Sequence, residues 1–141
     1  MDQSLLLYGP DRCDILPRRR PRRVRPLHLF LDGTGHLGFD ISDPFNNNSD
    51  VLSANPVPLN TWTFVTCSLD DSTGTMAVYI NGTLAGTNTT TFRPYGPLDP
   101  LANPGEGIGN VESSNYSFYF NGLIDDLKVY NTSAPAARAP S

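Results

Sequence analysis

The 141-residue chain has the length of one domain, and 38% hydrophobic residues are enough to form a core. With 17% charged residues, this composition excludes a chain that is disordered throughout. Thirteen Pro and twelve Gly favour a sheet protein with many turns over a helical bundle, because both residues break helices. The apolar runs fall far short of the roughly 20 residues that a membrane-spanning helix needs, so we expect no membrane insertion.

Charge divides the sequence into two unequal parts. Residues 1–25 hold seven Arg against three Asp, a net charge of +4, whereas residues 26–141 hold three basic residues against eleven acidic ones, a net charge of −8. The Arg- and Pro-rich start shows no apolar period, which predicts a disordered basic lead-in over residues 1–26. The Ala-, Pro- and Ser-rich residues 132–141 predict a tail, so the folded domain is predicted at residues 27–131.

Short apolar segments bounded by turn formers predict strands through this domain. His28–Asp32 and His36–Ile41 flank an Asp-Gly turn and form a predicted hairpin. Along Trp62–Leu69, successive side chains point to opposite faces of a strand, and the residues of both faces are largely apolar or β-branched. This pattern predicts a central strand that is covered on both faces.

The second half of the domain continues the pattern. An Asn81-Gly82 turn joins predicted strands at Thr75–Ile80 and Thr83–Gly86. After a long loop at roughly residues 91–105, short strands are predicted at Gly107–Asn110, Tyr116–Phe120 and Leu123–Tyr130. Because no segment has a helical pattern, the sequence predicts an all-β protein, an antiparallel sandwich or barrel.

Four segments in this order resemble laminin G-like, or concanavalin A-like, jelly-roll domains. They are Asn60–Val65 followed by Asp70, then Met76–Gly82, Gly107–Gly109 and Phe120–Asn131. The resemblance implies two antiparallel sheets packed face to face, with end loops that bind glycan, protein or calcium. Members of this family open with further strands that the predicted lead-in does not supply. We therefore expect a sandwich that is incomplete on its N-terminal side and self-associates through an exposed sheet edge.

Asp125 is the strongest candidate for a metal ligand. It shares strand parity with Leu127 and Val129, so it leans inward if those two residues face the core. A buried carboxylate needs hydrogen-bond donors or a cation. Backbone N–H groups of a turn meet this need, and so does a bound Ca²⁺, which the family resemblance implies near this Asp.

Loop residues are the candidates for ligand binding, because sugar rings stack on aromatic faces while sugar hydroxyls need polar partners. By this criterion we predict Tyr95, Tyr116 and Asn47 as ligand-binding residues. Sequons predict a glycoprotein that is extracellular or at the cell surface; they begin at Asn47, Asn81, Asn88, Asn115 and Asn131.

Catalysis has little support in the sequence. Glu106 and Glu112 lack the paired spacing of the glucanases, and His28 and His36 have no neighbouring nucleophile. The Arg-rich run at residues 18–25 has the charge to bind phosphate or sulfated glycan, but it has no interleaved aromatics for specific nucleic-acid binding. The sequence therefore predicts a non-enzymatic, adhesion-type module that binds carbohydrate or protein. The alternatives are a purely structural piece of a larger surface protein and a degenerate glucanase-type hydrolase.

Overall fold

The computed structural model describes residues 2–8, 27–45, 47–94, 108–109 and 119–131, and these residues form eight strands and no helix. The strands are β1 (Asp2–Tyr8), β2 (Leu27–Leu31), β3 (His36–Ser42), β4 (Asn48–Pro56), β5 (Thr63–Asp70), β6 (Thr75–Ile80), β7 (Thr83–Thr89) and β8 (Leu123–Tyr130). Within these residues, no helix is available to cross a lipid bilayer.

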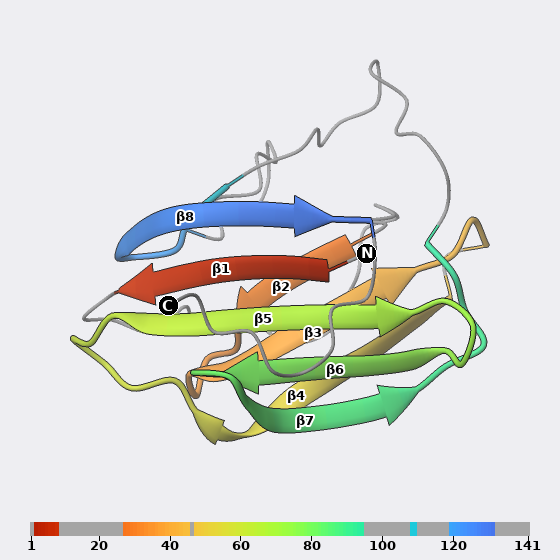
Figure 1. Ribbon diagram of the computed structural model, residues 1–141, viewed down its shortest axis with the longest axis horizontal. Coiled ribbons are helices and arrows are strands. Elements are labelled where there is room, and N and C mark those ends of the chain that lie inside the picture. The colour runs from red at the N-terminus through yellow and green to blue at the C-terminus, as the bar shows by residue number, and fades with distance from the viewer. Residues whose placement is uncertain (1, 9–26, 46, 95–107, 110–118, 132–141) are drawn as a thin grey trace.

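The strands form two stacked sheets (Figure 1). A five-stranded sheet has the order β7-β6-β5-β1-β8, and a three-stranded sheet has the order β2-β3-β4. Each recorded strand pair is antiparallel. The predicted antiparallel sandwich is therefore confirmed, with the smaller sheet covering only part of one face of the larger one.

The core lies between the two sheets and follows the period of two along each strand. In β5, Val65, Cys67 and Leu69 are buried, as the alternation predicts. They meet buried residues of the other sheet and of β6, which are Leu37, Phe39, Ile41, Val51, Met76 and Val78. The opposite face of β5 is half-buried, so the predicted cover is complete on one face and partial on the other, and β5 is the central strand of its sheet, as predicted.

The first strand contradicts part of the predicted lead-in. Asp2–Tyr8 pairs with β5 on one side and with β8 on the other, so residues 2–8 belong to the sandwich. The physical reason is that β5 and β8 each have a strand edge whose backbone N–H and C=O groups need hydrogen-bond partners. The backbone of the short apolar run at residues 2–8 provides these partners. The remainder of the predicted lead-in and the predicted tail at 132–141 lie outside the described residues.

The sequence pattern missed β4. Asn48–Pro56 is mostly polar, with Val51 and Leu52 as its only large aliphatic residues. A serine takes an interior position in this strand: the Ser53 hydroxyl is buried, accepts the N–H of Leu37 at 2.9 Å and donates to the carbonyl of Asn55 at 2.6 Å. Satisfied hydrogen bonds let a polar residue occupy a core position that an apolar pattern does not reveal.

The turns were predicted more accurately than the strand ends. The Asn81-Gly82 turn is confirmed, with φ of 50° at Asn81 and 77° at Gly82, as a two-residue hairpin turn requires. Strand β7 is longer than predicted and runs to Thr89. Most of the strands predicted at residues 107–110 and 116–120 lies outside the described residues, but Phe120 N–H donates to the carbonyl of Gly109 at 2.8 Å.

Candidate functional site

Three segments meet at one end of the sandwich, which we call the turn end. They are the β3–β4 turn (residues 43–47), the β5–β6 turn (residues 70–74) and residues 90–93 after β7, and strands β3, β5 and β7 all point toward this end (Figure 1). The Asn88 side-chain amide donates to the carbonyl of Asp50 at 2.8 Å, which joins β7 to β4. Thr90 N–H donates to the carbonyl of Gly74 at 2.9 Å, which joins the third segment to the second.

The β3–β4 turn is closed by one carboxylate. Asp43 accepts the N–H groups of Phe45 at 2.9 Å and Asn47 at 2.8 Å, and it also accepts the Asn47 side-chain amide at 2.9 Å. The bond from the Asn47 amide is the main reason why the pKa of Asp43 lies below its ordinary value, with the two N–H bonds adding to it and partial burial opposing it. A charged acceptor therefore ties the described residues Phe45 and Asn47 to the start of the turn.

This turn presents an aromatic side chain to solvent. The Phe45 side chain is 83% exposed, more than any other large hydrophobic residue among those that the structure describes. A ring held on a fixed turn loses little conformational entropy when a ligand packs against it. Asn47 of the same turn is one of the predicted ligand-binding residues, whereas Phe45 was missed because a lone Phe in sequence does not show whether it is buried.

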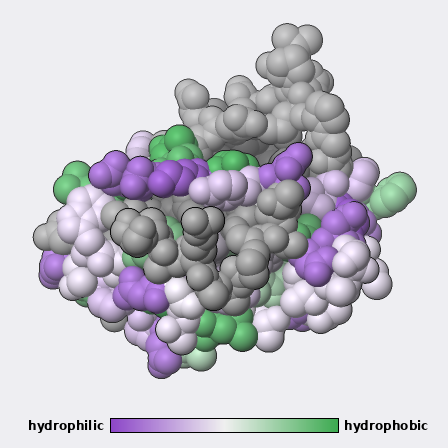
Figure 2. Space-filling model, viewed as in Figure 1, coloured by the Kyte–Doolittle hydropathy of each residue, from purple (hydrophilic) through white to green (hydrophobic). Residues whose placement is uncertain are grey.

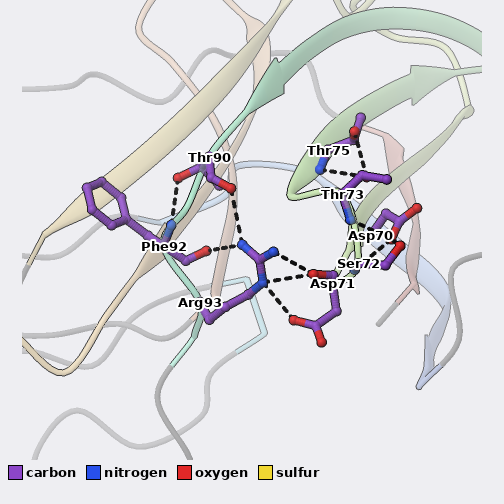
Figure 3. Close-up of polar contacts among 8 residues, drawn as sticks. All are labelled: Asp70, Asp71, Ser72, Thr73, Thr75, Thr90, Phe92 and Arg93. Atoms are coloured by element: carbon purple, nitrogen blue, oxygen red, sulfur yellow. Dashed lines mark hydrogen bonds and ion pairs between the residues drawn. The ribbon is translucent and has the colours of Figure 1, made fainter.

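The β5–β6 turn is built in the same way around Asp70 (Figure 3). Its carboxylate accepts the Ser72 hydroxyl at 2.6 Å and the N–H groups of Ser72 at 2.9 Å and Thr73 at 3.3 Å. The Ser72 hydroxyl bond, followed by the N–H bonds, lowers the pKa of Asp70. Gly74 closes the turn at φ +73°, and a Cβ at this position would lie 2.0 Å from the carbonyl oxygen of Thr90.

An arginine fastens the third segment to this turn (Figure 3). Arg93 Nε donates to the Asp71 carboxylate at 2.7 Å, and Nη1 donates to the carbonyls of Thr90 at 3.1 Å and Phe92 at 2.9 Å. Nε and Nη2 also donate to the carbonyl of Asp71. All three guanidinium nitrogens are thus engaged inside the protein, while the side chain of Asp71 remains 90% exposed.

Asp125 does not lie where its strand parity predicts, because β8 contains a β-bulge. The step from Ser4 to Leu6 on β1 spans Lys128 to Asp125 on β8, so β8 carries an extra residue, and Asp126 has φ of 56°. The bulge shifts the alternation by one and moves Asp125 to the face opposite Leu127. The inward orientation predicted for Asp125 is therefore wrong.

The Asp125 side chain is instead exposed, and it accepts the N–H of Asp126 at 2.8 Å. A neighbouring backbone N–H is thus one of its partners, in line with the backbone alternative of the sequence analysis. Among the described residues, no group of three or more His, Cys, Asp or Glu side chains could hold a metal ion. Calcium binding at Asp125 stays a prediction.

The face of β8 on which Leu127 and Val129 lie is poorly covered. Ile124 packs against the core, but Leu127 is 41% exposed and Val129 is 59% exposed. These two residues, on the edge strand of the five-stranded sheet, are therefore not core residues, and the condition under which Asp125 was expected to lean inward is not met. A hydrophilic strip follows β8 in the space-filling view, with apolar surface along its upper border (Figure 2). Self-association through this edge stays a prediction.

The predicted glycosylation sites differ in their surroundings. Asn47, Asn81, Asn88 and Asn131 are exposed, while Asn115 lies outside the described residues, as do the predicted ligand residues Tyr95 and Tyr116. Asn81 Oδ1 accepts the N–H of Phe64 at 3.0 Å, which leaves its amide nitrogen out of this bond. The amides of Asn47 and Asn88 donate to the protein itself.

The two histidines lie at different ends of the β2–β3 pair: His36 begins β3, far from the turn end, whereas His28 pairs with Asp40 near the end of β3 that leads into the β3–β4 turn. The His28 ring stacks on Phe30 with centroids 4.8 Å apart, and the Phe30 ring lies against Gly38 of the next strand. His36 Nδ1 lies 2.8 Å from the Thr34 hydroxyl in the β2–β3 turn. These contacts account for both rings through packing and turn closure.

Two stacked antiparallel sheets, with polar turns gathered at one end, define a jelly-roll β-sandwich of the lectin type. A laminin G family model described as the concanavalin A-like lectin/glucanases superfamily matches residues 22–138. The chain belongs to this superfamily, which confirms the resemblance found in the sequence.

Solved structures support the same fold. A proposed carbohydrate-binding protein from Bacteroides ovatus ATCC 8483 is similar with a TM-score of 0.68 and 16% identity over 96% of this chain. A heptameric SAP-like pentraxin from Limulus polyphemus is similar with a TM-score of 0.58 and 17% identity over 96% of this chain. The chain spans 38% of the first protein and 65% of the second. No curated protein matches the sequence.

Proposed function

We propose that the chain is a non-catalytic module that binds carbohydrate through its turn end. The superfamily is described by its lectins and glucanases, and one similar structure carries a carbohydrate-binding description, which supports binding of this ligand class. The fold alone does not specify a ligand, so the proposal depends on the chemistry of the turn end.

The observation that carries the proposal is the exposed ring of Phe45 on a turn fixed by Asp43. Sugar recognition combines an aromatic face, on which the apolar face of a sugar ring stacks, with fixed donors and acceptors for the hydroxyls. Phe45 supplies the ring, and the side-chain oxygen of Asn47, which takes no part in the bonds to Asp43, supplies an acceptor two residues away on the same turn. Because the turn is already closed in the free protein, binding does not need to order it.

An extracellular adhesion role extends this proposal. The support is the exposure of four sequon asparagines and a recognition fold that presents its turns at one end. Retention of purified protein on cell-surface glycans, and its loss after enzymatic removal of those glycans, tests this extension separately from the binding site.

A glycan array followed by calorimetric titration tests the proposal. We expect Phe45→Ala to weaken binding of the best array ligand about tenfold or more, which corresponds to about 1.4 kcal/mol, since the stacking surface is removed. The matched control is Leu84→Ala, because Leu84 is also an exposed apolar residue at 54% but lies at the start of β7, away from the turn end. Equal affinities of the two variants, or hydrolysis of a glucan by the wild-type chain, would contradict the proposal.

A further inference from the structure

We infer that the glycan recognised at the turn end is uncharged, so that neutral hexose oligosaccharides bind there and sulfated or carboxylated ones do not. This inference rests on the proposed function and specifies its ligand class. It follows from the charges that the described residues place at this end and from the bonds that Arg93 makes there.

Carboxylates outnumber cations at the turn end. Asp43, Asp70 and Asp71 belong to its turns, and exposed Asp50 lies near the start of the adjoining strand β4. Arg93 is the Lys or Arg that the described residues place in these turns, and the other described one, Lys128, lies on edge strand β8 with Asp126 3.8 Å away. Among the described residues, the three turn segments therefore carry a net negative charge.

Two of these carboxylates stay ionised under mildly acidic conditions. Asn47 lowers the pKa of Asp43, and Ser72 lowers the pKa of Asp70, through hydrogen bonds that stabilise the charged form. The negative charge of the turn end is thus built into the bonds that hold its turns. An anionic ligand would meet this charge at any pH at which the turns are intact.

Arg93 is not available to offset the charge of an anionic ligand. Recognition of sulfate or carboxylate commonly uses the forked donors of an Arg in a bidentate contact. In Arg93, each guanidinium nitrogen already donates to Asp71, Thr90 or Phe92. Releasing these donors would break the bonds from Arg93 to Asp71 and leave the bond from Thr90 N–H to Gly74 as the printed link between the two segments, so an anionic ligand would weaken the structure that it binds.

A neutral sugar meets complementary groups at the same end. Its hydroxyls donate hydrogen bonds, and the exposed carboxylate of Asp71 can accept them. Because the sugar is uncharged, no repulsion between like charges opposes this contact. Phe45 stacks on the apolar face of the ring, which a neutral hexose retains. The geometry therefore favours hydroxyl donors over anionic acceptors.

The Arg-rich start of the chain complicates a simple binding assay. Residues 1–25 carry a net charge of +4 and would attract a polyanion through counterion release. A test must therefore report where each ligand binds. Amide chemical shifts of the ¹⁵N-labelled full-length chain provide this information, with neutral glucose, galactose and mannose oligosaccharides as one set of probes and heparin as the other.

We expect a neutral probe to shift the amides of Phe45, Asn47 and Ser72, while heparin shifts only amides within residues 1–25. Heparin shifts at the turn end that vanish in Phe45→Ala would overturn this inference and leave the proposed carbohydrate site standing. If neither kind of probe shifts the turn end, the proposed function fails, and the inference fails with it.

A charge variant sharpens the test. Asp50→Lys adds a cation beside the turn end and leaves the backbone carbonyl that binds Asn88 in place. We expect heparin to begin shifting the turn-end amides in this variant, with at least a threefold gain in affinity at that site. Asp125→Lys makes the same charge change at exposed Asp125 on β8 and should produce no heparin shift at the turn end. Equal heparin responses of the two variants would contradict the inference.

Discussion

Two parts of the protein's five-stranded sheet, the turn end and the edge strand β8, are held in place differently. At the turn end, the side chains of Asp43 and Asp70 accept hydrogen bonds within their own turns, Arg93 donates to the carbonyl of Thr90, and the second sheet covers the strands behind these turns. Along β8, a bulge and exposed Leu127 and Val129 leave a strand with little cover. The comparison teaches that local polar bonds can close the turns of a candidate binding surface while another part of the same sandwich stays open.

The largest contrast is expected between two glycines with positive φ. Gly74→Ala forces a Cβ to within 2.0 Å of the Thr90 carbonyl at φ +73°, and we expect it to lower the free energy of unfolding by about 3 kcal/mol. In Gly109→Ala the new Cβ lies 3.6 Å from Ile124, an ordinary contact distance. We therefore expect this variant to lose only the cost of the positive φ, about 1 kcal/mol of unfolding free energy. Urea denaturation of both variants measures the difference, and equal losses would remove the special role of the close approach at Gly74.

Two valines compare the covered and open parts of the larger sheet. Val65 is 0% exposed, so Val65→Ala should cost about 2 kcal/mol by leaving a cavity. Val129 is 59% exposed, so Val129→Ala should cost about 0.5 kcal/mol or less. Thermal unfolding at several protein concentrations checks both values. A large, concentration-dependent loss for Val129→Ala would show that self-association covers β8.

The sequence was sufficient to predict the strands that follow a clear alternation and the turns marked by Asp or Asn-Gly. It could not predict β4, whose interior position is filled by hydrogen-bonded Ser53, or β1, whose pairing depends on distant strands. It also placed Asp125 on the wrong face, because one extra residue in a bulge reverses the alternation and leaves no signal in a single sequence.

The candidate site was predicted in part. The expectation that recognition uses end loops led to Asn47, which the structure places on the turn that carries Phe45. The exposure of Phe45 could not be read from the sequence, since aromatic residues are more often buried than displayed. The roles of Arg93 and Thr90 depend on contacts between residues about twenty positions apart, which periodicity does not encode.

Two ion pairs test whether the turn end is held by specific bonds. Arg93→Ala removes donors to three residues and should cost about 1–2 kcal/mol of unfolding free energy. Lys128→Ala removes an exposed pair with Asp126 at 3.8 Å and should cost about 0.5 kcal/mol or less. Chemical denaturation of the two variants in parallel measures both losses of unfolding free energy. A larger loss for Lys128→Ala than for Arg93→Ala would contradict the view that specific bonds hold the turn end.

The smallest expected effect is a local response to pH. Because the folded pKa of Asp43 lies below its ordinary value of 3.8, its bonds stabilise the turn above that value. As the pH falls below 3.8 and through the lowered folded pKa, this contribution is lost. The amide shifts of Phe45 and Asn47 should therefore change only below about pH 4 in the wild type and stay flat in Asp43→Ala. A transition well above pH 4 would show that another group controls the turn.

A crystal structure of the full-length chain with the strongest neutral oligosaccharide from the array tests the central claim most directly. The account predicts a sugar ring stacked on Phe45, with hydroxyls bonded to polar groups of the β3–β4 or β5–β6 turn. A sugar bound at the opposite end of the sandwich or along β8, with Phe45 left in solvent, would contradict it.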